Sequence, residues 1–101
     1  MTGEEYYIFY SKMLTLMVIP PSGVSFSVLS NEAQKVKQFY ESIASIINEN
    51  IENFVLLHEG FPLLDMDWII KSYGISNMDT IQLVFKDVRF FSNLDRKKKR
   101  T

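Results

Sequence analysis

One segment with helical periodicity lies between two groups of segments with strand periodicity, and this order limits what the chain can fold into. Residues 13–19 alternate between two faces, and residues 24–28 alternate strictly between apolar residues and serine. Between them, Pro20-Pro21-Ser22-Gly23 predicts a turn, because proline cannot donate to a strand ladder and glycine permits positive φ. The first quarter of the chain is therefore predicted to be an antiparallel hairpin.

Residues 31–48 have the spacing of an amphipathic helix of about four turns. Asn31 and Gln34 resemble a capping box, which predicts that the helix starts near Asn31. Isoleucine is a mediocre helix former, so this helix should depend on packing against a sheet. Its predicted apolar face consists of Val36, Phe39, Tyr40, Ile43, Ile46 and Ile47.

Residues 54–85 contain a second group of strands. Residues 54–59 alternate, and Gly60 with Pro62 predicts a turn before a short strand at Leu63 and Leu64. Asp67 can cap a single helical turn that ends at Gly74, and residues 80–85 form a last, β-rich strand.

The predicted fold class is α+β, with a mixed sheet of four to five strands and one long helix across one face. A single core should lie under the helix, formed by Leu14, Leu16, Phe26, Val28, Val36, Phe39, Ile43, Leu56, Ile70, Tyr73, Ile75, Ile81 and Leu83.

The charge distribution separates a body from a tail. Five of the 11 basic residues lie between Arg96 and Arg100, so residues 1–95 carry six basic and all 12 acidic side chains, a net charge of −6. An acidic body does not favour a nucleic-acid platform, whereas the basic tail suits a solvated linker or a nucleic-acid patch. The predicted organisation is an N-terminal extension over 1–12, one domain over 13–88 and a basic tail over 89–101.

Several features point away from catalysis, metals and cofactors. The chain has no cysteine and a single histidine, His58, so thiol chemistry and most metal sites lack their ligands. The four glycines are scattered and form no phosphate-binding loop. Asp65 and Asp67 are better explained as a solvated side chain and a helix cap than as cation ligands, and Trp68 as part of the core or its rim. We therefore expect a protein that is not an enzyme and binds no cofactor.

Residues 13–88 resemble the ubiquitin-like β-grasp family. The most specific part is the pattern Ile70-x-x-Tyr73-Gly74-Ile75-x-x-x-Asp79-Thr80-Ile81-x-Leu83-Val84, which is similar to the family's short helix, tyrosine and last strand. Met13-Leu-Thr-Leu and Leu56-Leu57-His58-Glu59-Gly60 add to the likeness. Within the family, Val24-Ser-Phe-Ser-Val28, Lys71-Ser-Tyr-Gly-Ile75 and Lys86-Asp87 look most like the N-terminal ubiquitin-like domain of DNA-damage-inducible proteasome-shuttle proteins. Those proteins also carry an aspartic protease domain, whose Asp-Thr/Ser-Gly motif is absent because Ile81 follows Asp79 and Thr80.

The chain departs from the family's pattern at two places that bear on function. It has no Gly-Gly terminus and continues through Phe90 and Phe91 to Thr101, so the resemblance does not extend to conjugated modifiers or sulfur carriers. Gln82 stands where the family often has a histidine.

The resemblance implies a partner-binding surface on the sheet. Leu57, Gly60 and Val84 match the family's main binding patch, and pleating sends Val55, Met17 and Ile19 to the same face as Leu57 and Val84. Gln82 and Glu59 are expected at its rim. The implied partner is a ubiquitin-binding element or a proteasomal receptor. An oligomerising structural domain and a nucleic-acid-associated domain acting through the basic tail remain the alternatives.

Two further expectations concern the N-terminus. Tyr6, Tyr7, Ile8, Phe9 and Tyr10 form an aromatic cluster that should pack on the domain or mediate a homodimer. Glu4 and Glu5 do not suit a signal peptide, and no apolar run approaches the ~18 residues of a membrane span. The expected location is therefore intracellular, cytoplasmic or nuclear.

Overall fold

The computed structural model describes residues 11–86, and the strands β1 (Met13–Ile19), β2 (Phe26–Asn31), β3 (Phe54–His58), β4 (Phe61–Pro62) and β5 (Thr80–Phe85) form one mixed sheet in the order β2-β1-β5-β3-β4. β1 pairs antiparallel with β2 and parallel with β5, while β3 is antiparallel to both β5 and β4. The first and last strands are thus neighbours in the middle of the sheet. The predicted α+β fold class is confirmed.

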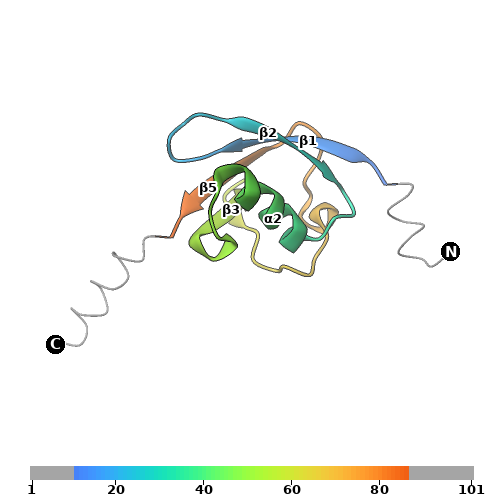
Figure 1. Ribbon diagram of the computed structural model, residues 1–101. Helices are drawn as coiled ribbons and strands as arrows, with labels where there is room; N and C mark the ends of the chain where they lie inside the picture. Colours follow the sequence, from blue (N-terminus) through green and yellow to red (C-terminus); the bar gives the residue numbers. More distant parts are fainter. Residues whose placement is uncertain (1–10, 87–101) are drawn as a thin grey trace.

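Helix α2 (Val36–Ile47) crosses one face of the sheet (Figure 1). Two short 3-10 segments, η1 (Ile51–Asn53) and η2 (Ile70–Tyr73), connect the strands. No helix within residues 11–86 is long and apolar enough to cross a membrane. The aromatic cluster at Tyr6–Tyr10 and the basic tail lie outside the described residues, as do the packing or homodimer contact expected of the cluster and the nucleic-acid contact that is the alternative for the tail.

The core lies between α2 and the inner face of the sheet. Ile43 is completely buried, and Leu83 is 2% exposed. Eleven of the thirteen predicted core residues are buried, whereas Phe26 and Tyr73 are only partly buried and pack against the cluster. The core also contains residues that the prediction omitted: Val18, Tyr40, Phe54 and Leu63.

The helix begins later than the sequence indicates. Asn31 is not its N-cap, because Asn31 Oδ1 accepts from the backbone N–H of Ala33 at 2.8 Å and from Ser11 Oγ at 2.6 Å. This local turn competes with the helix, which starts instead after Lys35, whose backbone N–H donates to Gln38 Oε1. The apolar face of α2 that is buried against the sheet is also narrower than predicted, since Ile46 is 54% exposed.

Two other local predictions are wrong. The turn after β3 lies at Glu59 and Gly60, both with positive φ, so β4 begins at Phe61 rather than at Leu63. Leu63 then enters the core while Leu64 stays exposed. Asp67 does not cap the short helix, because η2 starts after Ile69.

Tyr40 connects α2 to the short edge of the sheet. β4 is only two residues long, and just beyond it the Leu63 backbone N–H donates to the Leu56 carbonyl at 2.8 Å. The Tyr40 hydroxyl accepts the Leu56 N–H and donates to the Leu63 carbonyl, each at 2.9 Å. Its ring stacks on Phe54 with centroids 5.5 Å apart, and burial raises the pKa of the hydroxyl.

Candidate functional site

The outer face of the sheet, the side away from α2, carries the residues predicted as a site. β1, β3 and β5 alternate between buried residues and more exposed ones, as strands with one covered face do. Val55 and Leu57 are partly buried, whereas Met17 and Ile19 are each 38% exposed and Val84 is 50% exposed.

The strand register brings these residues into adjacent rows. Ile19 lies opposite Gln82, Gln82 opposite Leu57, and Leu57 opposite Pro62, so one row crosses four strands. Val55 and Val84 form the row on one side of it. Met17 and Thr80 form the row on its other side, on the same face of the sheet. Gln82 therefore lies in the middle of the surface and not at its rim, whereas Glu59 and Gly60 lie in the turn at one end.

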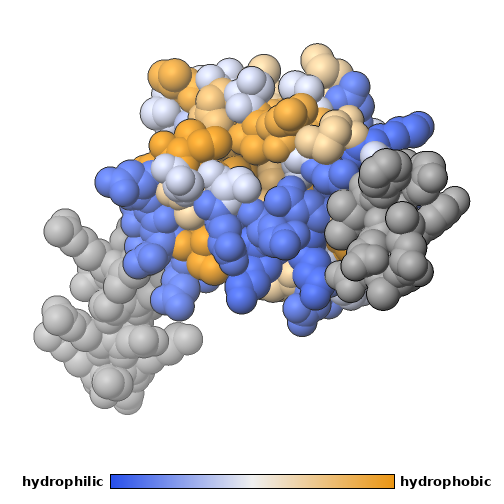
Figure 2. All heavy atoms as spheres, turned by 45° about the vertical axis from the view of Figure 1, so that its right-hand side comes forward, coloured by the Kyte–Doolittle hydropathy of each residue, from blue (hydrophilic) through white to orange (hydrophobic). Residues whose placement is uncertain are grey.

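Sequence reasoning missed part of this surface. Leu29 on β2 is 67% exposed and lies opposite Thr15, and Met13 at the start of β1 is 53% exposed. The signal was present: Leu29 follows the inward-facing Val28, so alternation assigns it to the outer face. In Figure 2, hydrophobic residues gather over the upper part of the molecule, at the height of β1 and β2 in Figure 1, and hydrophilic residues dominate below.

A shallow cleft adjoins this surface where β3 ends and β5 begins. It is lined by His58, Glu59, Gly60, Asp79, Thr80 and Gln82. His58 is 7% exposed, and its Nε2 lies 2.9 Å from Asp79 Oδ2. Because an ionised carboxylate only accepts, Nε2 carries the proton of this bond. His58 thus has a specific partner 21 residues away in the chain.

Asp79 also ends the loop that enters β5. The Ser76 backbone N–H donates to Asp79 Oδ2 at 2.9 Å and lowers the pKa of that carboxyl below its ordinary value, and the bond to His58 lowers it further. The loop is attached to β1 through two backbone bonds, from Met17 to Asp79 and from Met78 to Thr15. These bonds hold Asp79 in place at one side of the cleft.

Because Asp79 accepts hydrogen bonds from Ser76 and His58, protonating its carboxylate in acid should make the domain less stable. A lowered carboxyl pKa contributes stability that is complete above the ordinary value near 3.8 and is lost as the pH falls through the lower folded value. We expect the free energy of unfolding of the wild type to fall more steeply below pH 4 than that of Asp79→Asn. Urea unfolding between pH 2.5 and 7 measures this slope.

Asp67→Asn, at an exposed carboxyl on another loop, is the control for the loss of one negative charge and should keep the wild-type slope. If the free energies of unfolding of Asp79→Asn and of the wild type fall in parallel as the pH is lowered, the Asp79 interactions do not contribute to the acid dependence of stability.

The remaining candidate residues lie apart from this cleft. Trp68 is 50% exposed at the rim of the core, with its ring centroid 5.3 Å from that of Tyr73. Asp65 and Asp67 are both exposed, and the Asp67 backbone N–H donates to Asp65 Oδ1. Among residues 11–86, no three histidine, aspartate or glutamate side chains are grouped so that they could hold a metal ion.

Known structures share this architecture. The ubiquitin-like domain of an Arabidopsis thaliana protein superimposes with a TM-score of 0.74 at 22% identity, over 79% of this chain and 84% of that one. The ubiquitin-like domain of Plasmodium falciparum Dsk2 gives a TM-score of 0.68 at 19% identity, over 74% of this chain and all of that one. A designed protein based on human ubiquitin gives 0.66 at 29% identity, over 72% and 91%. No family model and no curated protein sequence matches the chain.

Residues 11–86 therefore have the ubiquitin-like β-grasp fold that the sequence resemblance implied. Tyr73 has a defined place in it, since its hydroxyl accepts the Asp65 backbone N–H at 2.9 Å.

Proposed function

We propose that this domain is a non-catalytic protein-interaction module of a ubiquitin or proteasome pathway, within a shuttle or adaptor protein. The outer face of the sheet is the proposed contact surface, and the partner is a ubiquitin-binding element or a proteasomal receptor. The resemblance to the ubiquitin-like domains of DNA-damage-inducible shuttle proteins supports this class of partner.

The observation that carries the proposal is the continuity of the surface. Ile19, Gln82 and Leu57 lie side by side on three neighbouring strands, and Val84 and Val55 continue the surface by one row. Within residues 11–86, α2 covers the other face and no second layer covers this one. A surface of this kind, in which exposed and partly buried apolar residues surround one polar side chain, marks an interaction site more often than isolated apolar residues do.

The exposure of the surface residues favours weak, reversible binding. Met17, Ile19 and Val84 are each half or more shielded by their neighbours, so the free domain tolerates the surface in water. Transient complexes bury small areas, below about 1,200 Å² in total, and depend on a few central side chains. Leu57 is central here, because it lies between Gln82 and Pro62.

We expect a ubiquitin-interacting helix or a proteasomal receptor fragment, titrated into the labelled protein, to shift NMR signals of β1, β3 and β5. Leu57→Ala and Val84→Ala should each weaken binding by about 1 kcal/mol, roughly fivefold, because each removes contact area near the centre of the surface.

Ile46→Ala is the matched control, since it removes an equally exposed apolar side chain from α2 on the opposite side. Its affinity should equal that of the wild type. Shifts confined to the α2 side, or unchanged affinity in both Leu57→Ala and Val84→Ala, would reject the outer face as the contact surface.

A further inference from the structure

The outer face has an unusual distribution of charge. None of the five strands contains an aspartate, glutamate, lysine or arginine. Exposed charges occur instead around α2, for example Lys35, Lys37 and Glu41. The middle of the outer face thus offers a partner apolar contact and the amide of Gln82, and any charge selection must come from the ends of the strands.

One end of the surface is acidic. Glu59, in the turn between β3 and β4, and Asp79, just before β5, line the same cleft. The Glu59 side chain is exposed, and its carboxylate takes part in no ion pair among the described residues. Gln82 belongs both to this cleft and to the apolar row through Leu57, so the two features are continuous.

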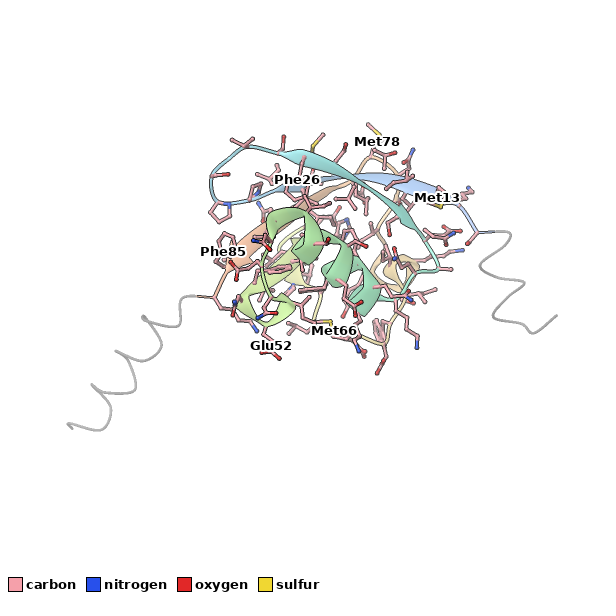
Figure 3. The ribbon with its side chains drawn as sticks, viewed as in Figure 1. Met13, Phe26, Glu52, Met66, Met78 and Phe85 are labelled. Carbon is pink, nitrogen blue, oxygen red and sulfur yellow. The ribbon has the colours of Figure 1, made fainter. Side chains whose placement is uncertain are left out.

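The other end carries the opposite charge. Lys86 directly follows β5, six residues after Thr80, which is about 20 Å along an extended strand. Figure 3 labels Met78, two residues before β5, and Phe85, its last residue. A partner that lies along β5 therefore meets carboxylates at one end and an ammonium group at the other.

We propose that the outer face selects a polypeptide whose apolar contact residues are flanked by a lysine or arginine, with that cation placed in the cleft beside Glu59 and Asp79. This inference rests on the proposed function, because it assigns the chemistry of the partner at the same surface. Opposite charges at the edge of an interface set orientation and partner choice more than total affinity.

The expected size of the selectivity follows from the exposure of the ion pair between the partner's cation and the carboxylates of the cleft. An ion pair between exposed side chains contributes about 0.2 to 1 kcal/mol, which corresponds to an affinity change of up to about fivefold. An acidic flanking residue in the same place meets like charges and is disfavoured by a similar factor. Both effects should weaken as salt shortens the Debye length from about 30 Å at 0.01 M to about 10 Å at 0.1 M.

The test uses the full 101-residue chain and three versions of one ubiquitin-interacting helix. The versions differ only in the residue that flanks one end of the apolar stripe, which is Lys, Gln or Glu, and each end is tested in turn. We expect NMR titrations at low salt to give the affinity order Lys, Gln, Glu, with steps of about twofold to fivefold.

Variants of the chain assign the selectivity to the cleft. Glu59→Gln keeps the shape of the side chain in its turn, where φ is 51°, and should reduce the step from Gln to Lys. Glu41→Gln removes an exposed carboxylate from α2 and should preserve the order. The backbone spectrum of each variant checks its fold.

The outcomes separate the two proposals. Equal affinities for the three helices, with shifts at Leu57 and Val84, overturn the charge selection and leave the proposed contact surface supported. A preference for the Glu version, or an unchanged step from Gln to Lys in Glu59→Gln, overturns the role of the cleft. The absence of shifts on the outer face with all three helices overturns both.

Discussion

Replacing Ile43 by alanine is expected to lower the free energy of unfolding by about 2 to 5 kcal/mol. Ile43 is completely buried between α2 and the sheet, so truncation removes apolar contacts and leaves a cavity that close-packed neighbours fill only partly. A domain of this size has a total stability of about 5 to 15 kcal/mol, so the loss is a large fraction of it. Urea unfolding followed by circular dichroism measures the change.

The same helix provides the control. Ile46 is three residues further along α2 and 54% exposed, so Ile46→Ala should change stability by no more than about 0.5 kcal/mol. Equal losses in the two variants would mean that α2 does not pack through the face that contains Ile43.

Removing one oxygen atom from Tyr40 should also destabilise the domain strongly. Tyr40→Phe keeps the ring on Phe54 but leaves the Leu56 N–H and the Leu63 carbonyl without their hydrogen-bond partner. A buried polar backbone group that loses its partner costs about 1 to 3 kcal/mol, so we expect a loss of about 2 to 4 kcal/mol for the two. Chemical unfolding gives the free energy, and amide hydrogen exchange should be faster at Leu56.

Tyr73→Phe is the matched control, because the Tyr73 hydroxyl accepts from the exposed backbone N–H of Asp65. Water replaces that partner, so the expected loss is no more than about 1 kcal/mol. If Tyr40→Phe costs no more than Tyr73→Phe, the hydroxyl does not complete the short edge of the sheet.

The elements with a strong period could be predicted from the sequence. Alternation in residues 13–19 and 80–85 indicates which side chains are buried, and helical spacing does the same for Val36, Phe39 and Ile43. The positions of Val55, Leu57 and Val84 on the outer face follow from the same alternation once the order of the strands is known. The strand order does not follow from this alternation, because periodicity carries no information on which strands pair.

The local deviations arise where a hydrogen bond decides between two conformations. Asn31 has the chemistry of a helix cap, but its side-chain oxygen accepts hydrogen bonds from Ser11 and Ala33 instead. Ser11 is twenty residues away in the chain. The His58–Asp79 pair and the bridging role of Tyr40 also join residues far apart in the sequence. No local pattern predicts such contacts, since each depends on the assembled sheet.

The central position of β5 has a consequence for how the protein is made. β5 lies between β1 and β3, so a nascent chain that has not yet reached residue 80 has only two separate hairpins, β1 with β2 and β3 with β4. A two-stranded hairpin alone is at best marginally stable in water. During synthesis, the apolar faces of these hairpins and of α2 therefore stay uncovered until residue 85 has left the ribosome, and the sheet then closes around β5, the last of its five strands to be made.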